Sequence, residues 1–167
     1  MNIFNIKRLI LFSSLIVFST SFIYAQKIDF SGTWIRNSDK TDAGDLSMNS
    51  VPASLEIKQD NNSISIKRNS KNAQGEIFNY SEVLNFNGTA ANSSPKANIN
   101  KKATIKWSDD HKTLIVSADY SDSTTGRAIQ KTNDTWSLSE DGKTMTITIV
   151  LNVNEQIHNL KEVFDKQ

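Results

Sequence analysis

The sequence predicts an all-β fold: an antiparallel up-and-down meander of about eight to ten strands that closes into a β-barrel. Apolar residues recur at every second position over much of the chain, which is the period of a strand buried on one face. Short clusters of Asp, Asn and Gly separate these segments and are typical of hairpin turns. No window shows a convincing helical pattern. A two-sheet β-sandwich made from the same strands is the competing architecture.

Residues 1–25 are predicted to be a secretory signal peptide and residues 26–167 a single domain. The basic pair Lys7-Arg8 precedes an apolar run, and small Ala25 stands before the expected cleavage point, which leaves Gln26 as the first residue. The alternative is an uncleaved membrane anchor. No later apolar stretch approaches the ~20 residues of a membrane helix. We therefore expect export to the periplasm or the medium, with no membrane span after cleavage.

The charge of the chain is nearly balanced. The whole sequence has 19 basic and 18 acidic residues, a formal charge of +1, and no cysteine. Lys7 and Arg8 belong to the signal, so the remaining 142 residues carry 17 basic against 18 acidic side chains, a charge of −1. A nucleic-acid partner is not expected, because such proteins carry a basic patch or stripe. Without cysteine there is no disulfide framework and no lipid-modified export route.

The expected strands follow one another at short intervals. The strongest prediction is the segment in which Met145, Ile147 and Ile149 alternate with threonines. Segments 55–58 and 64–66 form a hairpin around an Asp-Asn-Asn turn. The nine candidate segments are 30–36, 55–58, 63–67, 78–86, 102–107, 114–120, 128–138, 144–153 and 160–164.

A turn motif is repeated in the second half of the chain. Residues 108–114 and 139–145 align 31 residues apart, and each copy follows an aromatic strand and opens an apolar one. An acidic residue starts the turn, Gly142 supplies a positive φ, and Lys-Thr enters the next strand. His111 occupies the glycine position of the other copy, and His is enriched among non-glycine residues with positive φ.

Closure into a barrel is expected because a meander of this length would otherwise leave long unpaired edges. An eight-stranded barrel is filled by side chains or holds one small ligand. Residues 37–52 and 87–101, which contain Pro52 and Pro95, are expected to be long connecting loops. Such loops rim the open end of an up-and-down barrel and often carry recognition.

The segment Gly32-Thr33-Trp34 resembles the Gly-x-Trp that begins the first strand of lipocalins, fatty-acid-binding proteins and avidins. Residues 136–143 and 162–167 resemble segments of small secreted bacterial lipocalin-like (calycin-type) proteins. The resemblance implies a lipocalin-like barrel whose end is plugged by Trp34 beneath a cation, Lys166 or Lys161. Fatty-acid-binding proteins hold the ligand carboxylate with Arg-x-Tyr in the last strand, where this chain has Glu162-Val163-Phe164. A long-chain fatty acid is therefore not expected.

Aromatic residues on the inward faces of successive strands are the candidate ligand-binding residues. They either line a cavity or fill the interior as core. Arg127, which follows a glycine, is a candidate for the barrel mouth. Polar residues on the same faces, Glu82 and Asp134 among them, would be satisfied by a wet or ligand-filled interior, or be turned away by a β-bulge. The aromatic candidates are Phe78, Tyr80, Phe86, Trp107, Tyr120 and Trp136.

No catalytic or metal-binding motif is present in the sequence, so neither an enzyme nor a cofactor is expected. His111 and His158 are the two histidines, and the acidic pairs at 109–110 and 140–141 fit hairpin turns better than acid–base chemistry. The leading hypothesis is an exported, non-enzymatic barrel that binds a small apolar or aromatic ligand. The alternative is a compact β module with a solid core that binds a protein or glycan through its long loops.

Overall fold

The computed structural model describes residues 28–71 and 76–167, and the predicted signal peptide with its Ala25–Gln26 cleavage point lies outside them. The described chain is built from antiparallel strands, with one short 3-10 helix, η1, at Met48–Ser50. The strands are β1 (Gly32–Arg36), β2 (Ser54–Gln59), β3 (Ser63–Lys71), β4 (Ile77–Asn85), β5 (Ala91–Lys96), β6 (Ile99–Trp107), β7 (Leu114–Asp122), β8 (Ala128–Leu138), β9 (Thr144–Val153) and β10 (Gln156–Lys166).

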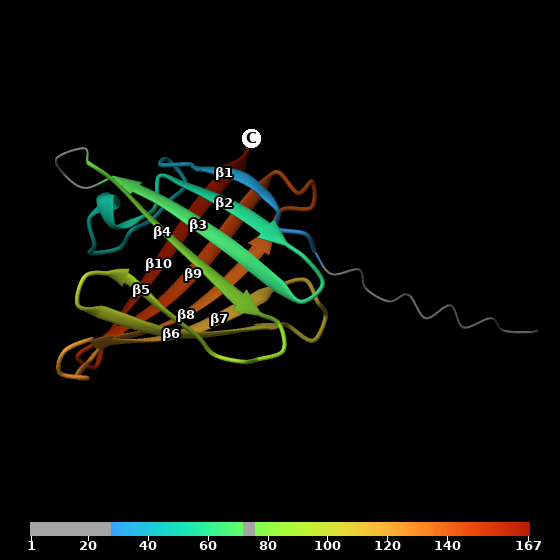
Figure 1. Ribbon diagram of the computed structural model, residues 1–167. Helices are drawn as coiled ribbons and strands as arrows, with labels where there is room; N and C mark the ends of the chain where they lie inside the picture. Colours follow the sequence, from blue (N-terminus) through green and yellow to red (C-terminus); the bar gives the residue numbers. More distant parts are fainter. Residues whose placement is uncertain (1–27, 72–75) are drawn as a thin grey trace, which may run out of the picture.

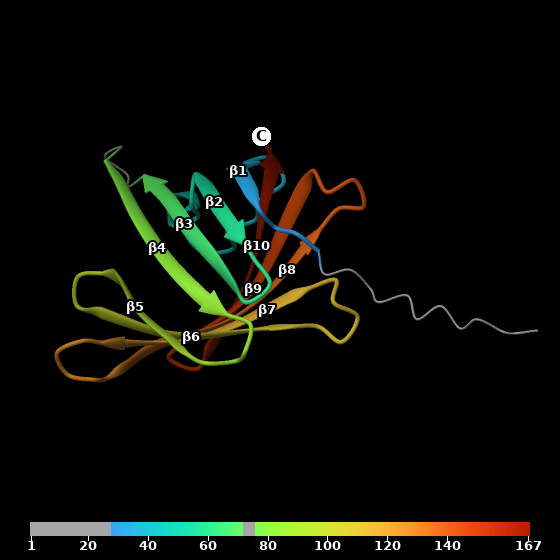
Figure 2. The ribbon, with the colours of Figure 1, turned by 45° about the vertical axis from the view of Figure 1, so that its right-hand side comes forward.

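The ten strands form one sheet in the order β4-β3-β2-β1-β10-β9-β8-β7-β6-β5. Consecutive strands pair except for β4 and β5, and the first strand, β1, pairs with the last, β10. The sheet curls until β4 and β5 face each other, and these two strands run apart from the turn that connects them (Figures 1 and 2). The predicted meander and barrel are confirmed, and the barrel is nearly closed, with a seam between β4 and β5.

Alternation of buried and exposed residues fixes which side chains enter the barrel. In β9, Met145, Ile147 and Leu151 are buried while Thr148 is exposed. Because β9 pairs with β8 on one side and β10 on the other, its register aligns the inward residues of all three strands. The alternating pattern in the sequence was therefore a sufficient guide to the inner face.

The prediction of a long loop at 87–101 is wrong. Residues Ala91–Lys96 form β5, which pairs with β6 and is followed by a two-residue turn in which Asn98 has a φ of 62°. β5 escaped detection because it has no alternating apolar residues. Pro95 lies in this strand, which a proline tolerates because β5 is an edge without a second hydrogen-bonded neighbour.

The other expected loop, 37–52, is a connection between β1 and β2 and is fixed to the barrel wall. Asp42 and Lys161 exchange backbone hydrogen bonds of 2.7 and 2.8 Å, and Thr41 Oγ1 accepts a bond of 3.0 Å from the Val163 amide. Arg36 donates to the carbonyls of Met48 and Val51 at 2.8 and 2.7 Å. The segment therefore lies along the edge of β10, and its Ala43 and Val51 belong to the hydrophobic core.

The repeated turn has the predicted conformation in both copies. His111 and Gly142 have φ values of 56° and 67°. Ser108 Oγ donates to Asp110 Oδ1 at 2.6 Å, and Ser139 Oγ donates to Asp141 Oδ1 at the same distance. The acidic residues of these turns therefore hold the backbone of the hairpin. Among the described residues, none of the helical structure is long and apolar enough to cross a membrane.

Candidate ligand-binding site

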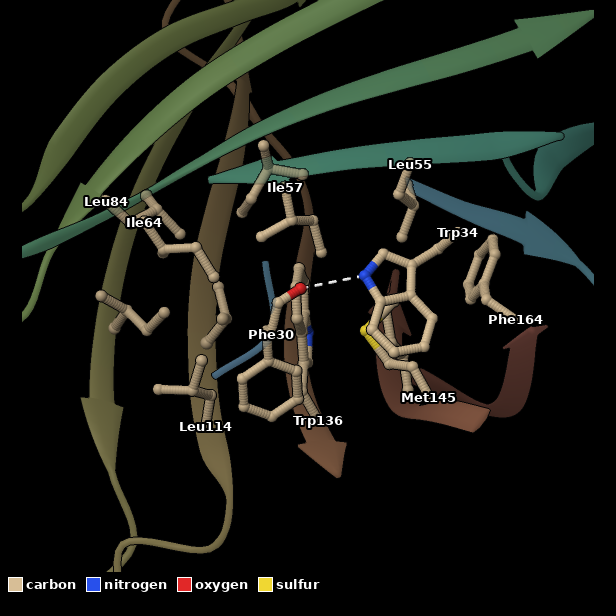
Figure 3. Packing of buried hydrophobic residues seen from close by; sticks show 14 of the residues in the cluster. Phe30, Trp34, Leu55, Ile57, Ile64, Leu84, Leu114, Trp136, Met145 and Phe164 are labelled. Carbon is tan, nitrogen blue, oxygen red and sulfur yellow. Dashed lines mark hydrogen bonds between the residues drawn. The ribbon is translucent and has the colours of Figure 1, made fainter. Parts of the chain in front are cut away.

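The two ends of the barrel differ in their interior. We call the end with the β2–β3, β4–β5, β6–β7 and β8–β9 turns the aromatic end, and the opposite end the polar end. At the aromatic end Phe30, Trp34, Trp136 and Phe164 are fully buried and pack with Leu55, Ile64 and Met145 (Figure 3). This half of the interior is a hydrophobic core of the ordinary kind.

Three of the six aromatic candidates belong to that core. The ring of Trp107 lies 6.2 Å from Phe30 and 5.5 Å from Phe86, and the ring of Trp136 lies 6.3 Å from Phe30. Trp136 has no exposed surface, and Phe86 and Trp107 pack against the buried cluster. The structure therefore places Phe86, Trp107 and Trp136 as packing residues of the aromatic end.

Trp34 closes the aromatic end from the first strand. Its indole Nε1 donates to the Phe30 carbonyl at 2.9 Å (Figure 3). Lys166 Nζ lies 5.2 Å from its ring centroid. Gly32 has a φ of 143°, and a Cβ there would lie 2.8 Å from Lys166 Cε. The Gly-x-Trp motif thus has a local cause, because the glycine leaves the path along which the Lys166 side chain reaches the indole.

The polar end holds a buried ionic cluster centred on Glu82 of β4. Lys101 Nζ of β6 donates to both carboxylate oxygens of Glu82 at 2.8 Å, and Arg68 Nη1 of β3 donates to Oε1. The side chains of Glu82 and Lys101 are 1% and 4% exposed. Burial raises the pKa of Glu82, but the charges of Arg68 and Lys101 outweigh it, and the pKa lies below its usual value. Glu82 is therefore ionised at neutral pH.

This cluster spans the seam between β4 and β5. Tyr80 Oη donates to Glu82 Oε2 at 3.0 Å and lies 2.6 Å from Ser93 Oγ of β5. Lys96 Nζ of β5 lies 5.9 Å from the ring centroid of Phe78 at the end of β4. Since the ladder gives β4 and β5 no backbone pairing, side chains hold these two edges together. Separation of β4 from β5 therefore breaks no ladder of backbone hydrogen bonds.

Two further carboxyl groups enter the same half from β8 and β10. Asp134 Oδ1 is buried without a hydrogen-bond partner. Glu162 is 9% exposed. Burial raises the pKa of Asp134, and burial raises the pKa of Glu162 to about 7. These groups are unlike Glu82, whose oxygens are saturated by cations.

The walls around these carboxyl groups are amphipathic. Tyr80 and Tyr120 are half-buried, and Lys101 Nζ lies 5.7 Å from the centroid of each ring. Arg68 lies 6.0 Å above the ring of Trp136 and so separates the polar half from the core. Burial raises the pKa of Tyr120 to about 12, so both tyrosines are neutral hydroxyl groups at physiological pH. Among the sequence candidates, Tyr80 and Tyr120 are the two whose rings lie against Lys101 of the ionic cluster.

The remaining candidates lie at the periphery. Phe78 is 38% exposed at the polar end, on the same face of β4 as Tyr80. Arg127 is exposed in the β7–β8 turn, which is at the polar end, and points to no described partner. His158 Nδ1 lies 3.7 Å from Asp45 on the outer wall, which is beyond a hydrogen bond. In the part of the chain that the structure describes, no three His, Cys, Asp or Glu residues form a group that could hold a metal ion.

A depression of about 520 Å³ lies on the wall formed by β5, β6 and β7, and it adjoins the ionic cluster, because Ser93 and Lys101 are among its lining residues. All of its lining residues are polar or charged, and most of them are exposed. Five of the eight lie in the segment 87–101, which the sequence predicted to be a long loop. The lining residues are Asn92, Ser93, Ser94, Asn100, Lys101, Lys102, Asp119 and Ser121.

Sequence reasoning found Glu82 and Asp134 but missed Arg68, Lys101 and Glu162 as interior groups. Each continues an alternating apolar face: Arg68 follows Ile64 and Ile66 by two-residue steps. Lys101 precedes Ala103 in the same way, and Glu162 stands between Leu160 and Phe164 on one face of β10. Strict application of the two-residue period would have placed all three inside the barrel.

The fold and the site together define a nearly closed antiparallel β-barrel with a divided interior. No family model matches the chain, and no curated protein matches it. Among solved structures, the chain is similar in fold to secretory abundant heat soluble protein 4 from Ramazzottius varieornatus. That comparison has a TM-score of 0.48 and 11% identity, and it covers 82% of this chain and 94% of the other.

Proposed function

We propose that the protein is an exported, non-enzymatic, lipocalin-like binding protein that takes a small ligand with an apolar or aromatic body into the polar end of its barrel. The observation that carries the proposal is Asp134 Oδ1, which is buried without a hydrogen-bond partner in the described chain, in the same half of the barrel as the buried carboxyl group of Glu162. A buried polar group without a partner costs about 1–3 kcal/mol. Such a cost is tolerated where a ligand or ordered water completes the hydrogen bonds.

The walls of the polar end suit the body of such a ligand. Tyr80 and Tyr120 present ring faces, and Ala103 and Ala118 are small residues paired on the inner faces of β6 and β7. A site with apolar walls and a few fixed polar groups is the usual form of a small-molecule site. The seam between β4 and β5 offers an entry, because only side-chain contacts close it.

Ligand binding is tested by titrating the purified protein with an environment-sensitive apolar dye while following dye and tryptophan fluorescence. We expect saturable binding that Ala118→Leu weakens at least about tenfold, since the added side chain fills the interior. Ser117→Leu is the matched control, because the neighbouring position faces outward in β7 and receives the same side chain. Equal binding by the two variants, or no saturable binding at all, would refute the proposed site.

Export is proposed from the N-terminal sequence and is tested separately. When the full chain is expressed in an exporting host, we expect the protein outside the cytoplasm with Gln26 as its first residue, as read by mass spectrometry of the purified protein. Intact Met1 in a cytoplasmic product would contradict this part of the proposal.

The outer depression favours a second candidate function, recognition of a glycan. Asn92, Asn100 and Asp119 present amide and carboxylate groups of the kind that bind hydroxyl groups, and Lys102 adds a cation. Soluble oligosaccharides should then shift the amide resonances of β5 and β6, and Asn100→Ala should abolish the shifts. Shifts confined to inward residues such as Ala103 and Ala118 would assign binding to the interior instead.

A further inference from the structure

The interior of the polar end contains an uneven number of charges. Five ionisable side chains, some basic and some acidic, enter it from five different strands, and the protonation of each is influenced by at least one of the others. Two of them are cations and three are carboxyl groups. They are Arg68 of β3, Glu82 of β4, Lys101 of β6, Asp134 of β8 and Glu162 of β10. When all five are ionised, the cluster has an excess of one negative charge.

The two cations are committed to Glu82. Lys101 gives that carboxylate two hydrogen bonds of 2.8 Å, and Arg68 gives it a third bond. Of the two remaining carboxyl groups, Asp134 has a buried Oδ1 without a partner in the described chain, and Glu162 is buried while the printed bonds of Arg68 and Lys101 go to Glu82. The network therefore lacks one hydrogen-bond donor, and a positively charged donor would complement these carboxyl groups.

Other charged groups near Glu162 do not supply that donor. Arg36 of β1 acts on Glu162 through its positive charge, but its Nη1 is bound to the carbonyls of Met48 and Val51, and its buried Nε has no hydrogen-bond partner in the described chain. Lys166 of β10 extends to the ring of Trp34 at the aromatic end. Tyr80 and Tyr120 are neutral. Without a ligand, a proton on Glu162 balances the charge, since burial raises the pKa of this group to about 7.

We propose that the polar end of the barrel selects small ligands that carry one protonated amine, with the ammonium group held by Glu162 and Asp134 and the apolar body lying against Tyr80 and Tyr120. This inference rests on the proposed function and names the chemical class of its ligand. An anionic ligand would face two carboxylates whose neighbouring cations are already bound. A neutral ligand would leave at least one buried carboxyl group without a donor.

The charge balance also sets the pH dependence of binding. Below about pH 7 an ammonium ion must displace the proton of Glu162, so binding releases a proton and weakens as pH falls. Above that pH Glu162 is ionised and no proton is released. Between pH 7 and pH 6 the affinity for the amine should therefore fall by up to about tenfold, while the affinity for a neutral analogue should not.

The test uses three probes of one shape: 2-phenylethylamine, 2-phenylethanol and 3-phenylpropanoate. Calorimetric titration of the full mature protein at pH 8 should give an affinity for the amine at least about tenfold above that for the alcohol, with the anion weakest. At pH 6, titrations in two buffers of different ionisation enthalpy should show release of a proton on amine binding. Equal affinity for amine and alcohol overturns the inference.

Variants identify the groups responsible. Glu162→Gln should remove the preference for the amine and its pH dependence, and Asp134→Asn should reduce the preference while leaving the pH dependence. Glu140→Gln is the matched control, because Glu140 is an exposed acid in the β8–β9 turn and should change neither. Amine binding that survives Glu162→Gln unchanged places the ligand elsewhere and overturns the inference.

The outcomes separate this inference from the proposed function. If the apolar dye binds in a manner sensitive to Ala118→Leu but the three probes bind alike, the interior is a ligand site without the proposed charge selection. If neither the dye nor any of the probes binds, both the site and its selectivity are refuted.

Discussion

The two halves of the barrel interior show how one repeated strand pattern can build two different environments. At the aromatic end, the inward residues Phe30, Trp34 and Trp136 fill the space and belong to one buried hydrophobic cluster. At the polar end, the inward positions of the strands carry charged side chains. Both carboxylate oxygens of Glu82 accept hydrogen bonds from Lys101, whereas Glu162 is buried without such a bond from Lys101. Each half contains a buried polar atom without a partner in the described chain, Trp136 Nε1 in the first and Asp134 Oδ1 in the second. The second half differs because its inward groups are ionisable, which is the property expected of a recognition site rather than a core.

The largest expected difference between the halves is in the free energy of unfolding that is lost when an aromatic ring is removed. Trp34→Ala should lower the free energy of unfolding by about 3–5 kcal/mol, because it leaves a cavity in a closely packed core and removes the bond to the Phe30 carbonyl. Phe78→Ala is the control at the polar end, where the ring is 38% exposed. It should cost about 1 kcal/mol or less in a urea titration. Similar losses would show that both ends are packed alike.

The saturated part of the polar cluster should respond strongly to removal of its central charge. Glu82→Gln leaves Arg68 and Lys101 buried without a counter-ion and should destabilise the protein by about 3 kcal/mol. Replacing all three residues together, as Arg68→Met, Glu82→Leu and Lys101→Met, should restore most of that loss, because neither cation is then left buried without Glu82. Chemical denaturation of both variants measures the difference. A triple variant no more stable than Glu82→Gln would mean that the ionic cluster itself stabilises the fold.

Glu162, in the other part of the polar cluster, should respond in the opposite way, because removal of its charge should stabilise the protein at pH 8. Burial raises the pKa of Glu162 from its ordinary 4.5 to about 7. The folded protein therefore binds more protons than the unfolded chain between these values, and stability falls as the pH rises through that window. The loss attributable to Glu162 between pH 5 and pH 8 is about 2.5 kcal/mol. Glu162→Gln should remove this component, so the variant should be more stable than the natural protein at pH 8. Parallel pH profiles for the two proteins would contradict the assignment.

The smallest expected effect concerns the seam. Tyr80→Phe removes the hydroxyl that joins Glu82 to Ser93 and should cost about 1 kcal/mol. It should also speed hydrogen exchange of the amides in β4 and β5, because these edges are joined by side chains only. Tyr120→Phe removes a hydroxyl away from the seam and serves as the control. Exchange that rises equally in both variants would show that the seam is not held by Tyr80.

Sequence patterns predicted most of the fold because each long strand has one apolar face. The inward residues of β9 and the positive φ values of His111 and Gly142 follow directly from local chemistry. β5 was missed because an edge strand that pairs on one side can be polar throughout and can contain Pro95. Its true neighbour across the seam, β4, is set by the curl of the whole sheet and not by any local signal.

The site was predicted less completely because charge pairing depends on which strands face each other across the barrel. The parity of Glu82 and Asp134 was visible in the sequence, and so was that of Tyr80 and Tyr120. That Lys101 bridges to Glu82 while Glu162 receives no cation could not be read from either strand alone. Bulky aromatic residues at inward positions suggested a ligand pocket, yet Trp107 and Trp136 pack with Phe30 in the core.

The two halves of the barrel interior are proposed to have different roles, one as a hydrophobic core and the other as the place where an amine binds. A crystal structure of the protein with 2-phenylethylamine tests this proposal most directly. We predict the ammonium nitrogen within about 3.2 Å of a carboxylate oxygen of Glu162 or Asp134, with the ring against Tyr80 or Tyr120 and the aromatic end unchanged. An ammonium group bound in the outer depression at Asn100 and Asp119, or a polar end closed by its own side chains with the amine absent, would contradict the claim.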